Sequence, residues 1–327
     1  MSTARKILQL LKSNCQEELS SSAICDVLMI SRNAVWKHVQ ALRDQGYQIE
    51  AHSRCGYRLV ASPDRPDAAE VLPLLTTAGI GRTLHYKDVT ESTNRDAAAG
   101  AEAGCEDGTV FCAGEQRGGR GRMDRKWFSP PGVNLYFSMV LRPAVATGDA
   151  ASLPLVVGIA VASVIDKLVP ELEPCLKWPN DILINNRKVC GILCEMQAQI
   201  DCGVRYITAG AGINVNSEQS SLPEALQQIA TSLKSETGRE FSRTELLAQI
   251  LNEFECRYDI WKSYGFEPLS AIMDKYDALK GRRISVQQGQ RTITGEAAGV
   301  QADGALKVKT DSGLESVYSG EARIVGY

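Results

Sequence analysis

A glycine- and arginine-rich segment, GGRGRMDRKW at positions 118–127, carries the clearest chemical signal in the sequence. Glycines allow a backbone to approach a ligand closely, and guanidinium groups bind phosphate or carboxylate through two hydrogen bonds. The segment therefore predicts an anion-holding loop, with a flexible basic surface loop as the alternative. It is neither a Walker A loop, which requires GK[ST], nor a GxGxxG motif, because Asp124 stands where the third glycine would be. Its key residues are Gly118, Gly119, Gly121, Arg120, Arg122, Arg125 and Lys126.

Two further segments offer polar or charged groups at expected turns. In KWPNDILI, the proline predicts a turn that presents Asn180 and Asp181 at the start of a strand. Lys188 follows Asn185-Asn186, which is a plausible hairpin turn, so a solvated hairpin lysine is the ordinary interpretation of this segment alone. Without further context, neither segment indicates more than a turn.

The elements that would position these residues indicate a mixed α+β domain over residues 70–275. Helical and strand-like stretches alternate irregularly there, which fits α+β better than a doubly wound fold. The helical stretches are Ala97 to Ala103, Leu153 to Leu168 and Thr244 to Tyr258, and the strand-like runs are Thr109 to Ala113, Leu135 to Val140, Ile182 to Ile184 and Ile207 to Gly210.

Both ends of the chain differ from this middle part. From Arg282 onward only strand-like alternation remains, around turns at Asp303-Gly304 and Ser312-Gly313, which predicts a small terminal barrel over residues 276–327. Pro and Asp are concentrated between Ala61 and Ala69, which predicts an extended linker at residues 63–69. A separate N-terminal domain of residues 1–62 follows from that boundary.

The N-terminal segment has the spacing of a winged helix-turn-helix. Two short helices are expected around Ile7 to Leu11 and after a cap at Ser22. Ser31 can cap a third helix, with Val35, Val39 and Leu42 facing inward until Gly46 ends it. Strands at Tyr47 to Ala51 and Tyr57 to Val60 then form a hairpin wing with Arg54 and Arg58.

The outer face of the third helix suits a major groove. It carries hydrogen-bonding and cationic groups, whereas a merely solvated polar face is the alternative. Residues 1–60 hold eight Lys and Arg against five Asp and Glu, a local +3 in a chain of net charge −3. We therefore expect local contact with operator DNA through Arg32, Asn33, Trp36, Lys37, Gln40 and Arg54.

Composition argues against a membrane protein, a secreted protein and a metal-binding protein. With 327 residues and 44% hydrophobic content, the chain suits two or three globular domains. No apolar run reaches the roughly 20 residues of a membrane span, and the longest, Leu153 to Ile165, is expected to be a buried helix. No secretory signal is apparent, and the ten scattered cysteines with three histidines predict reduced cytoplasmic thiols and no metal site.

Five motifs stand in a fixed order between Glu91 and Val215. They are ESTN at Glu91 to Asn94, GRGRMDRKWFSPPGVNLYFS at Gly119 to Ser138, KWPNDILI at Lys177 to Ile184, RKVCGILCE at Arg187 to Glu195, and GAGINV at Gly210 to Val215. Together they resemble bacterial biotin protein ligases of the bifunctional type, whose winged-helix domain represses biotin synthesis genes. The resemblance covers essentially the whole chain.

The resemblance implies a two-step reaction. Biotin and Mg-ATP form biotinyl-5'-AMP, and a lysine of the biotin carboxyl carrier protein of acetyl-CoA carboxylase then takes the biotinyl group. Bringing a carboxylate to roughly 4 Å from a phosphate costs about 4 kcal/mol of repulsion at an effective dielectric of about 20. Arg122, Arg125 and Lys188 are our candidates to offset it, with Lys188 at the α-phosphate and carboxylate by similarity to the family.

The neutral ureido ring of biotin needs hydroxyls and amides. Ser92, Thr93, Asn94 and Gln116 supply them, although Ser92 or Thr93 can also cap the following helix. By resemblance, the biotin site also includes Gly119, Arg120, Arg122, Lys188, Gly191 and Gly210. The ATP and adenylate site includes Arg122, Arg125, Trp127, Asn180, Lys188 and Asn214.

The acceptor lysine must lose its proton, since only about one lysine in 2,500 is neutral at pH 7. Asp181 is our hypothesis for orienting or deprotonating it, which makes Lys188, Arg122 and Asp181 the expected catalytic residues. The chain departs from the family pattern at Met123 and Asp124, where many relatives have Arg or Gly. Arg323 is the nearest C-terminal cation to the position expected near the adenine, but its offset does not match.

Like charges in the glycine-rich loop should repel, so we expect the adenylate to order residues 118–127. The resemblance implies that the adenylate-bound form is a homodimer on a palindromic operator, with biotinyl-5'-AMP as corepressor. Two alternatives are a biotin-sensing repressor without catalysis and a lipoate ligase on a similar scaffold. Retention of Lys188 and Arg122 argues against the first, and the winged helix with its basic loop argues against the second.

Overall fold

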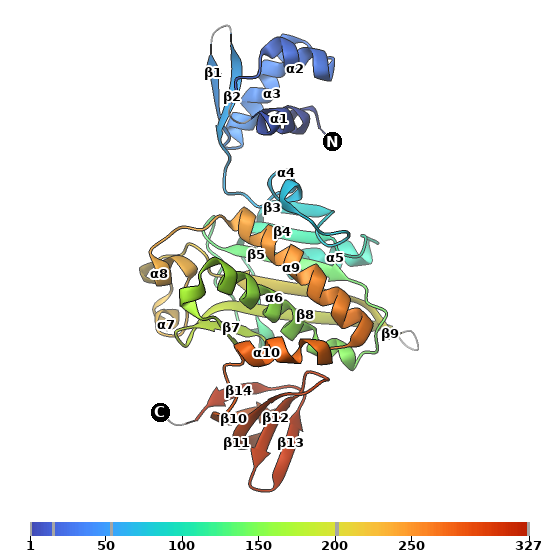
Figure 1. The fold of residues 1–327 in the computed structure, drawn as a ribbon, viewed down its shortest axis with the longest axis vertical. Coiled ribbons are helices and arrows are strands. Elements are labelled where there is room, and N and C mark those ends of the chain that lie inside the picture. The colour runs from blue at the N-terminus through green and yellow to red at the C-terminus, as the bar shows by residue number, and fades with distance from the viewer. Residues whose placement is uncertain (1, 15–16, 53–54, 200–202, 326–327) are drawn as a thin grey trace. The chain divides into compact units, whose positions relative to one another are not determined.

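The computed structural model describes residues 2–14, 17–52, 55–199 and 203–325. The chain divides into two compact units, Met1–Arg65 and Pro66–Tyr327 (Figure 1). The division falls within the expected linker. Residues 276–327, which we expected as a separate domain, belong to the second compact unit.

The first unit is a three-helix bundle with a two-stranded wing. Its elements are α1 (Thr3–Ser13), α2 (Ser21–Leu28), α3 (Arg32–Asp44), β1 (Gln48–His52) and β2 (Gly56–Ala61). Ser31 caps α3 as expected, since its Oγ accepts from Ala34 N at 3.2 Å. The expected cap of α2 is wrong by two residues: Ser20 accepts from Ala23 N, and Ser22 lies inside the helix.

The core of this unit follows the predicted helical spacing. Val35, Val39 and Leu42 are buried on α3, which packs against α1 and α2, and Ile7 and Ile24 are buried on those two helices. The wing is joined to the bundle by a backbone bridge between Leu19 and Tyr57. Gly56 permits this contact because its φ is +129° and a Cβ there would meet Leu19 O.

The second unit is built on a seven-stranded sheet of order β3-β4-β5-β9-β8-β7-β6. Strands β3 and β4 are parallel, and the other neighbours are antiparallel. The strands are β3 (Leu84–Thr90), β4 (Val110–Gln116), β5 (Leu135–Leu141), β6 (Cys175–Lys177), β7 (Asp181–Ile184), β8 (Arg187–Gln199) and β9 (Gly203–Ile213). The expected α+β class and all four expected strand-like runs are confirmed, whereas β3, β6 and β8 were missed.

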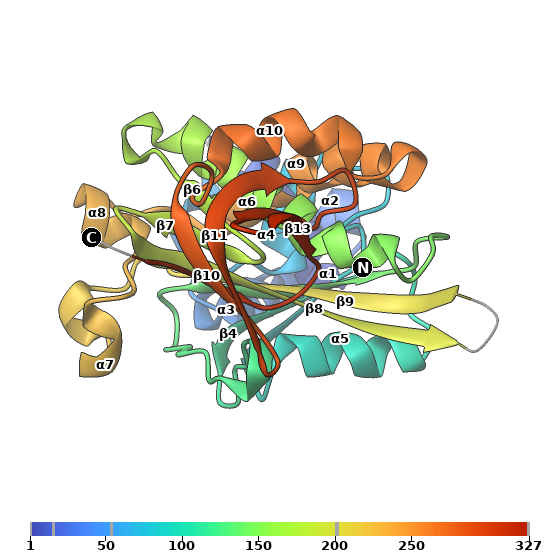
Figure 2. The same ribbon diagram turned by 90° about the horizontal axis from the view of Figure 1, so that it is seen from below.

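Helices cover the two faces of this sheet unequally, as Figure 2 shows, with α6, α9 and α10 on one side and α5 on the other. The α helices are α4 (Ala68–Val71), α5 (Thr93–Glu102), α6 (Leu153–Leu168), α7 (Glu224–Gln227), α8 (Leu233–Thr237), α9 (Arg243–Tyr264) and α10 (Ser270–Tyr276). Short 3-10 turns are η1 (Leu72–Leu74), η2 (Arg122–Asp124), η3 (Asp149–Ser152), η4 (Pro170–Leu172), η5 (Gln219–Ser221) and η6 (Glu267–Leu269).

Helix α6 is apolar nearly all round, and it is the expected buried helix. The stretch Asp149–Leu168 is long and apolar enough to cross a membrane by length and composition, but 72% of its most apolar window is buried inside the protein. It packs against β6, β7 and β8 on one side and α9 on the other. A helix buried on all sides in a large core has this composition without a membrane.

The C-terminal strands form a five-stranded antiparallel sheet of order β13-β12-β11-β10-β14. They are β10 (Arg283–Gln288), β11 (Arg291–Val300), β12 (Leu306–Thr310), β13 (Gly313–Val317) and β14 (Glu321–Ile324). Both expected turns are present, with Gly304 and Gly313 at positive φ. The sheet shares the large core of the unit, and Trp178 Nε1 donates to Gly304 O at 3.1 Å.

Candidate active site

The cavity floor is the antiparallel pair β8 and β9. In β9, Ala209, Ala211 and Ile213 belong to the large core, so the alternate residues Gly210 and Gly212 face the opposite side. Their partners across the pair are Leu193 and Gly191, respectively. A cavity of about 450 Å³ opens above these four residues.

Side chains fill the space that the missing Cβ atoms leave. A Cβ on Gly210 would lie 2.0 Å from Asn94 Oδ1 and 3.0 Å from Ser138 Oγ. A Cβ on Gly212 would lie 2.4 Å from Trp127 Nε1, and one on Gly191 would lie 2.9 Å from Trp127 Cζ3. These glycines therefore admit protein side chains, in addition to any ligand.

The end of the cavity at Gly210 is a network of mostly neutral polar groups. Thr93 donates to Gln116 Oε1 from both its backbone N, at 2.9 Å, and its Oγ1, at 3.2 Å. Asn94 Nδ2 donates to Leu193 O at 3.1 Å, and Ser138 Oγ donates to Asn94 Oδ1 at 2.6 Å. Thr93, Asn94 and Ser138 are all buried, so this polar end is held rigidly.

Ser92 takes the N-cap position of α5, but its side chain makes no capping hydrogen bond. Its buried hydroxyl lines the cavity. The capping alternative for this hydroxyl is therefore wrong.

The glycine-rich segment forms a tight loop over the cavity. Trp127 N donates to Gly119 O at 2.9 Å, and Gly121 N donates to Arg125 O at 2.7 Å. Gly119 lets the loop close, since a Cβ there would lie 2.7 Å from both Ser129 Oγ and Trp127 O. At the tip, Met123 and Asp124 have φ values of 55° and 56°, the left-handed region that few side chains adopt.

Two loop arginines are ion-paired with acids from distant parts of the chain. Arg120 Nη2 contacts Glu195 Oε1 at 3.0 Å, and Glu195 also accepts from Asn94. Arg125 binds both carboxylate oxygens of Glu321 on β14, at 3.0 and 2.5 Å. The expectation that the loop charges repel one another without compensation is therefore wrong for these residues.

The Arg125 pair shifts the ionisation of its partner. The hydrogen bond from Arg125 lowers the pKa of Glu321 below its ordinary value, against the effect of partial burial. The same hydrogen bond raises the pKa of Arg125. Because Arg125 is 57% exposed, we expect the pair to contribute little to global stability.

Beyond Trp127 the cavity becomes cationic. Lys188 Nζ lies 2.6 Å from Asp181 Oδ1 and 5.2 Å from the centre of the Trp127 ring. Arg122 Nη1 donates to Asn180 Oδ1 at 3.3 Å, and burial lowers the pKa of Arg122. An arginine remains charged despite such a shift. Arg122 thus meets Lys188 and Asp181, which come from a distant part of the sequence, at one end of the cavity.

The two asparagines expected at the ATP site have their amides bonded to backbone. Asn180 Nδ2 donates to Ile192 O at 2.7 Å, and Asn214 Nδ2 donates to Thr231 O at 2.9 Å. Both still line the cavity. They fix the neighbouring segments in addition to any contact with a ligand.

Sequence reasoning missed one wall of the cavity. Residues 222–230, hereafter the wall segment, present Leu222, Leu226 and Ile229 to the cationic end. Their i, i+4, i+7 spacing is the helical pattern that could have found them. Ser138 and Glu195, which hold the polar end together, were also missed as functional residues.

The expected DNA-binding face occupies α3 of the first unit. Arg32, Asn33, Trp36 and Lys37 are exposed there, and Gln40 is half-buried. Arg54 lies outside the described residues. In the wing, Arg58 Nη2 is paired with Glu50 Oε2 at 2.7 Å, and that bond lowers the pKa of Glu50.

Known families match all three parts of the chain. The Biotin/lipoate A/B protein ligase family matches residues 86–214, an HTH domain matches residues 3–58, and the Biotin protein ligase C terminal domain matches residues 280–323. The fold and these matches define a ligase of the biotin/lipoate type that carries a helix-turn-helix domain.

Relatives narrow the class. The Bifunctional ligase/repressor BirA of Bacillus spizizenii is 37% identical over 99% of both chains. The Biotin--[acetyl-CoA-carboxylase] ligase of Mycobacterium tuberculosis is 32% identical over 71% of this chain and 85% of its own. The solved biotin protein ligase of Aquifex aeolicus in complex with biotin and ATP has a TM-score of 0.65, with 29% identity over 74% of this chain and 98% of its own. The chain therefore belongs to the family of bifunctional biotin ligase/repressors.

Proposed function

We propose that the protein makes biotinyl-5'-AMP from biotin and ATP and transfers the biotinyl group to a lysine of the biotin carboxyl carrier protein of acetyl-CoA carboxylase. The observation that carries this proposal is that one cavity has two different ends. The end at Gly210 is polar and mostly neutral, since Arg120 there is paired with Glu195, and the end at Lys188 is cationic. Biotin has the same division, since its neutral ureido ring and its carboxylate lie at opposite ends. Its ring fits the polar end, with the carboxylate directed to the cations.

In the first step a carboxylate oxygen attacks the α-phosphorus, and the bond to pyrophosphate breaks. Lys188 and Arg122 face the position where negative charge from both substrates accumulates, and fixed cations stabilise such a transition state without reorganisation. Mg²⁺ is expected to enter with ATP. Among the described residues no three His, Cys, Asp or Glu side chains form a metal-binding cluster, so phosphates and water would supply most of its ligands.

In the second step the lysine nitrogen attacks the acyl carbon, AMP leaves, and the amine loses a proton. Asp181 is proposed to orient or deprotonate that amine, although its Oδ1 also lies 2.6 Å from Lys188 Nζ. Asp181→Asn should therefore be measured in both half-reactions. Normal transfer from preformed adenylate by this variant would exclude the role in the second step.

Exchange of pyrophosphate into ATP tests the first step with biotin and lipoate in parallel. We expect exchange that depends on biotin, followed by labelling of a carrier domain with labelled biotin. Exchange with lipoate alone would indicate a lipoate ligase. Binding of biotin with no exchange and no labelled carrier would indicate a sensor.

The repressor function is proposed to use the exposed face of α3, with biotinyl-5'-AMP as corepressor and a homodimer as the DNA-bound form. Ordering of residues 118–127 by the adenylate would complete the dimer surface. Sedimentation with and without biotin and ATP tests this linkage, because an unchanged mass at micromolar protein contradicts it. Both activities are expected in the cytoplasm, where the described cysteines, all free thiols, would stay reduced.

The DNA interface can be tested without knowing the operator. Lys37→Ala should lower the slope of log affinity against log salt by about one unit on random-sequence duplex DNA. Lys262→Ala, on α9 of the other unit, is the matched control and should leave the slope unchanged. Equal slopes for Lys37→Ala and wild type would exclude Lys37 from the interface.

A further inference from the structure

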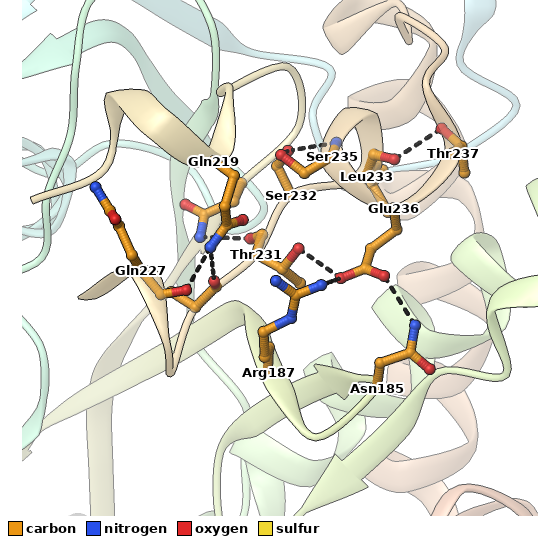
Figure 3. Close-up of polar contacts among 12 residues, drawn as sticks. Asn185, Arg187, Gln219, Gln227, Thr231, Ser232, Leu233, Ser235, Glu236 and Thr237 are labelled. Carbon is orange, nitrogen blue, oxygen red and sulfur yellow. Dashed lines mark hydrogen bonds and ion pairs between the residues drawn. The ribbon is translucent and has the colours of Figure 1, made fainter. Parts of the chain in front are cut away.

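Glu236 on α8 is a buried carboxylate to which no role has been assigned above. Its side chain is 5% exposed and accepts three hydrogen bonds. Arg187 Nη2 and Thr231 Oγ1 donate to Oε1 at 2.7 and 2.6 Å, and Asn185 Nδ2 donates to Oε2 at 2.8 Å (Figure 3). Burial of a carboxylate is costly unless it is paired and hydrogen-bonded, so these donors hold Glu236 in one place.

The three donors come from both sides of the cationic end. Asn185 lies in the turn of the β7-β8 hairpin, and Arg187 is the first residue of β8, directly before Lys188. Thr231 directly follows the wall segment. Glu236 therefore joins the hairpin that carries Lys188 to the segment that closes the cavity beside it.

Backbone bonds make the same connection at Lys188 itself. Lys188 N donates to Ile229 O at 2.8 Å, and Thr231 N donates to Lys188 O at 3.0 Å. Among the described residues these are the two backbone bonds between Lys188 and residues 229–231. Thr231 O also accepts from Asn214 Nδ2, and the hydroxyl of Thr231 is held by Glu236. Loss of the carboxylate would leave Arg187 and Asn185 without their acceptor and weaken the hold on Thr231.

Of the apolar side chains in the wall segment, only Leu222 is buried. Ile229 is 60% exposed, and Leu226 is only partly buried. Within the segment, Gln227 Nε2 donates to Leu222 O at 3.0 Å, and from just before the segment Gln219 Nε2 donates to Ala230 O at 3.0 Å (Figure 3). These bonds shape the segment, but they do not attach it to β8.

We propose that Glu236 is a positioning residue for adenylation: it holds the wall segment against β8, so that Leu226 and Ile229 face the nucleotide beside Lys188. The inference rests on the proposed assignment of the cationic end to ATP. Glu236 acts through Thr231 and Arg187 and does not itself touch a substrate. Its removal should therefore affect ATP and leave binding of the biotin ring, at the opposite end, nearly unaffected.

The test compares Glu236→Gln and Glu236→Asp with wild type in the full chain. We expect Glu236→Gln to raise KM for ATP by about tenfold in pyrophosphate exchange. A change of about tenfold corresponds to the free energy lost with one hydrogen bond to a charged group. The Kd for biotin without nucleotide should change less than about twofold, and Glu236→Asp should recover part of the loss. Glu171→Gln is the matched control, since it removes an exposed Arg-Glu pair at 3.3 Å.

Hydrogen exchange provides a second readout that does not depend on the proposed function. The Lys188 and Thr231 amides should exchange faster in Glu236→Gln than in Glu171→Gln, while amides of the central β5-β9 pair keep their rates. Unchanged exchange at Lys188 and Thr231 would overturn the inference. Equal weakening of biotin and ATP would also overturn it, because it would indicate a general structural role.

Leu226→Ala distinguishes failure of the proposed role of Glu236 from failure of the assignment of the cationic end to ATP. If Leu226→Ala raises KM for ATP and Glu236→Gln does not, the role of Glu236 is wrong and the assignment of the cationic end stands. If Leu226→Ala leaves KM for ATP unchanged, the assignment of this end to ATP is wrong, and the inference falls with it.

Discussion

The two ends of the cavity are built in different ways. At Gly210 the groups Thr93, Asn94 and Ser138 lie on a helix and a strand, are almost fully buried, and are hydrogen-bonded to one another and to the ion-paired Glu195. At Lys188 the charged groups lie on a hairpin and a loop, are partly exposed, and are ion-paired with acids. The neutral end has a fixed shape, whereas the cationic end can exchange its partners.

This difference suits two kinds of ligand. A neutral ring is recognised by hydrogen-bonding groups in fixed positions, and burial makes such a network rigid. An anion must displace the carboxylates that neutralise the cations before it binds. Asp181 and Glu321 thus keep Lys188 and Arg125 compensated until a stronger anionic ligand competes for them.

The largest effect is expected from Lys188→Ala. Removal of a cation that stabilises transition-state charge should lower the rate of adenylation by about 10²- to 10³-fold, while biotin still binds at the polar end. Pyrophosphate exchange and calorimetry with biotin measure the two quantities. Lys262→Ala is the matched control, because it breaks a Lys-Asp pair of 2.9 Å on α9. An exchange rate within a few-fold of wild type would refute the division of the cavity.

A pair of glycine substitutions sharpens the comparison. Gly210→Ala places a methyl group 2.0 Å from Asn94 Oδ1, and the Asn94 side chain is held from two sides. The substitution should lower the free energy of unfolding by about 1–3 kcal/mol and should weaken biotin binding. Gly212→Ala places its methyl group against the side chain of Trp127 on the loop, which can move. We expect a smaller loss of stability, measured by urea unfolding. Equal losses would show that the two ends are equally rigid.

Much of the fold was predictable because its signals are local. Hydrophobic periodicity, capping residues and turn residues predict the helices of the first unit, helix α6 and the turns at Gly304 and Gly313. The sequence pattern did not predict strand β8, and the reason is again local. Its cavity face carries Gly191 and Glu195, which are depleted in strands, because that face lines a site and packs against no core.

The site was predictable only in its residue types. Arg120, Arg125 and Lys188 were expected near anions, but Glu321 lies 196 positions from Arg125, and no spacing rule connects them. Similarly, Asn94 and Ser138 meet over Gly210 only because β5 and β9 pair in one register. Such contacts depend on tertiary register, which a single sequence does not fix.

The smallest effect is expected from Glu321→Gln. Because Arg125 lowers the pKa of Glu321 in the folded protein, the pair stabilises the fold fully above the ordinary glutamate value of 4.5 and loses this contribution as pH falls through the lower folded value. At pH 7 the variant should lose less than about 1 kcal/mol, since the pair is partly exposed. The difference from wild type in urea unfolding should shrink as pH falls below 4.5.

Cleavage of residues 118–127 by trypsin tests whether the same pair restrains the loop. The control is Arg291→Gln, which breaks the exposed pair with Glu315 in the C-terminal sheet and should leave this cleavage unchanged. Glu321→Gln should accelerate that cleavage, because it releases Arg125 from β14. If the loop is cleaved at the same rate in both variants, the Arg125-Glu321 pair does not restrain the loop.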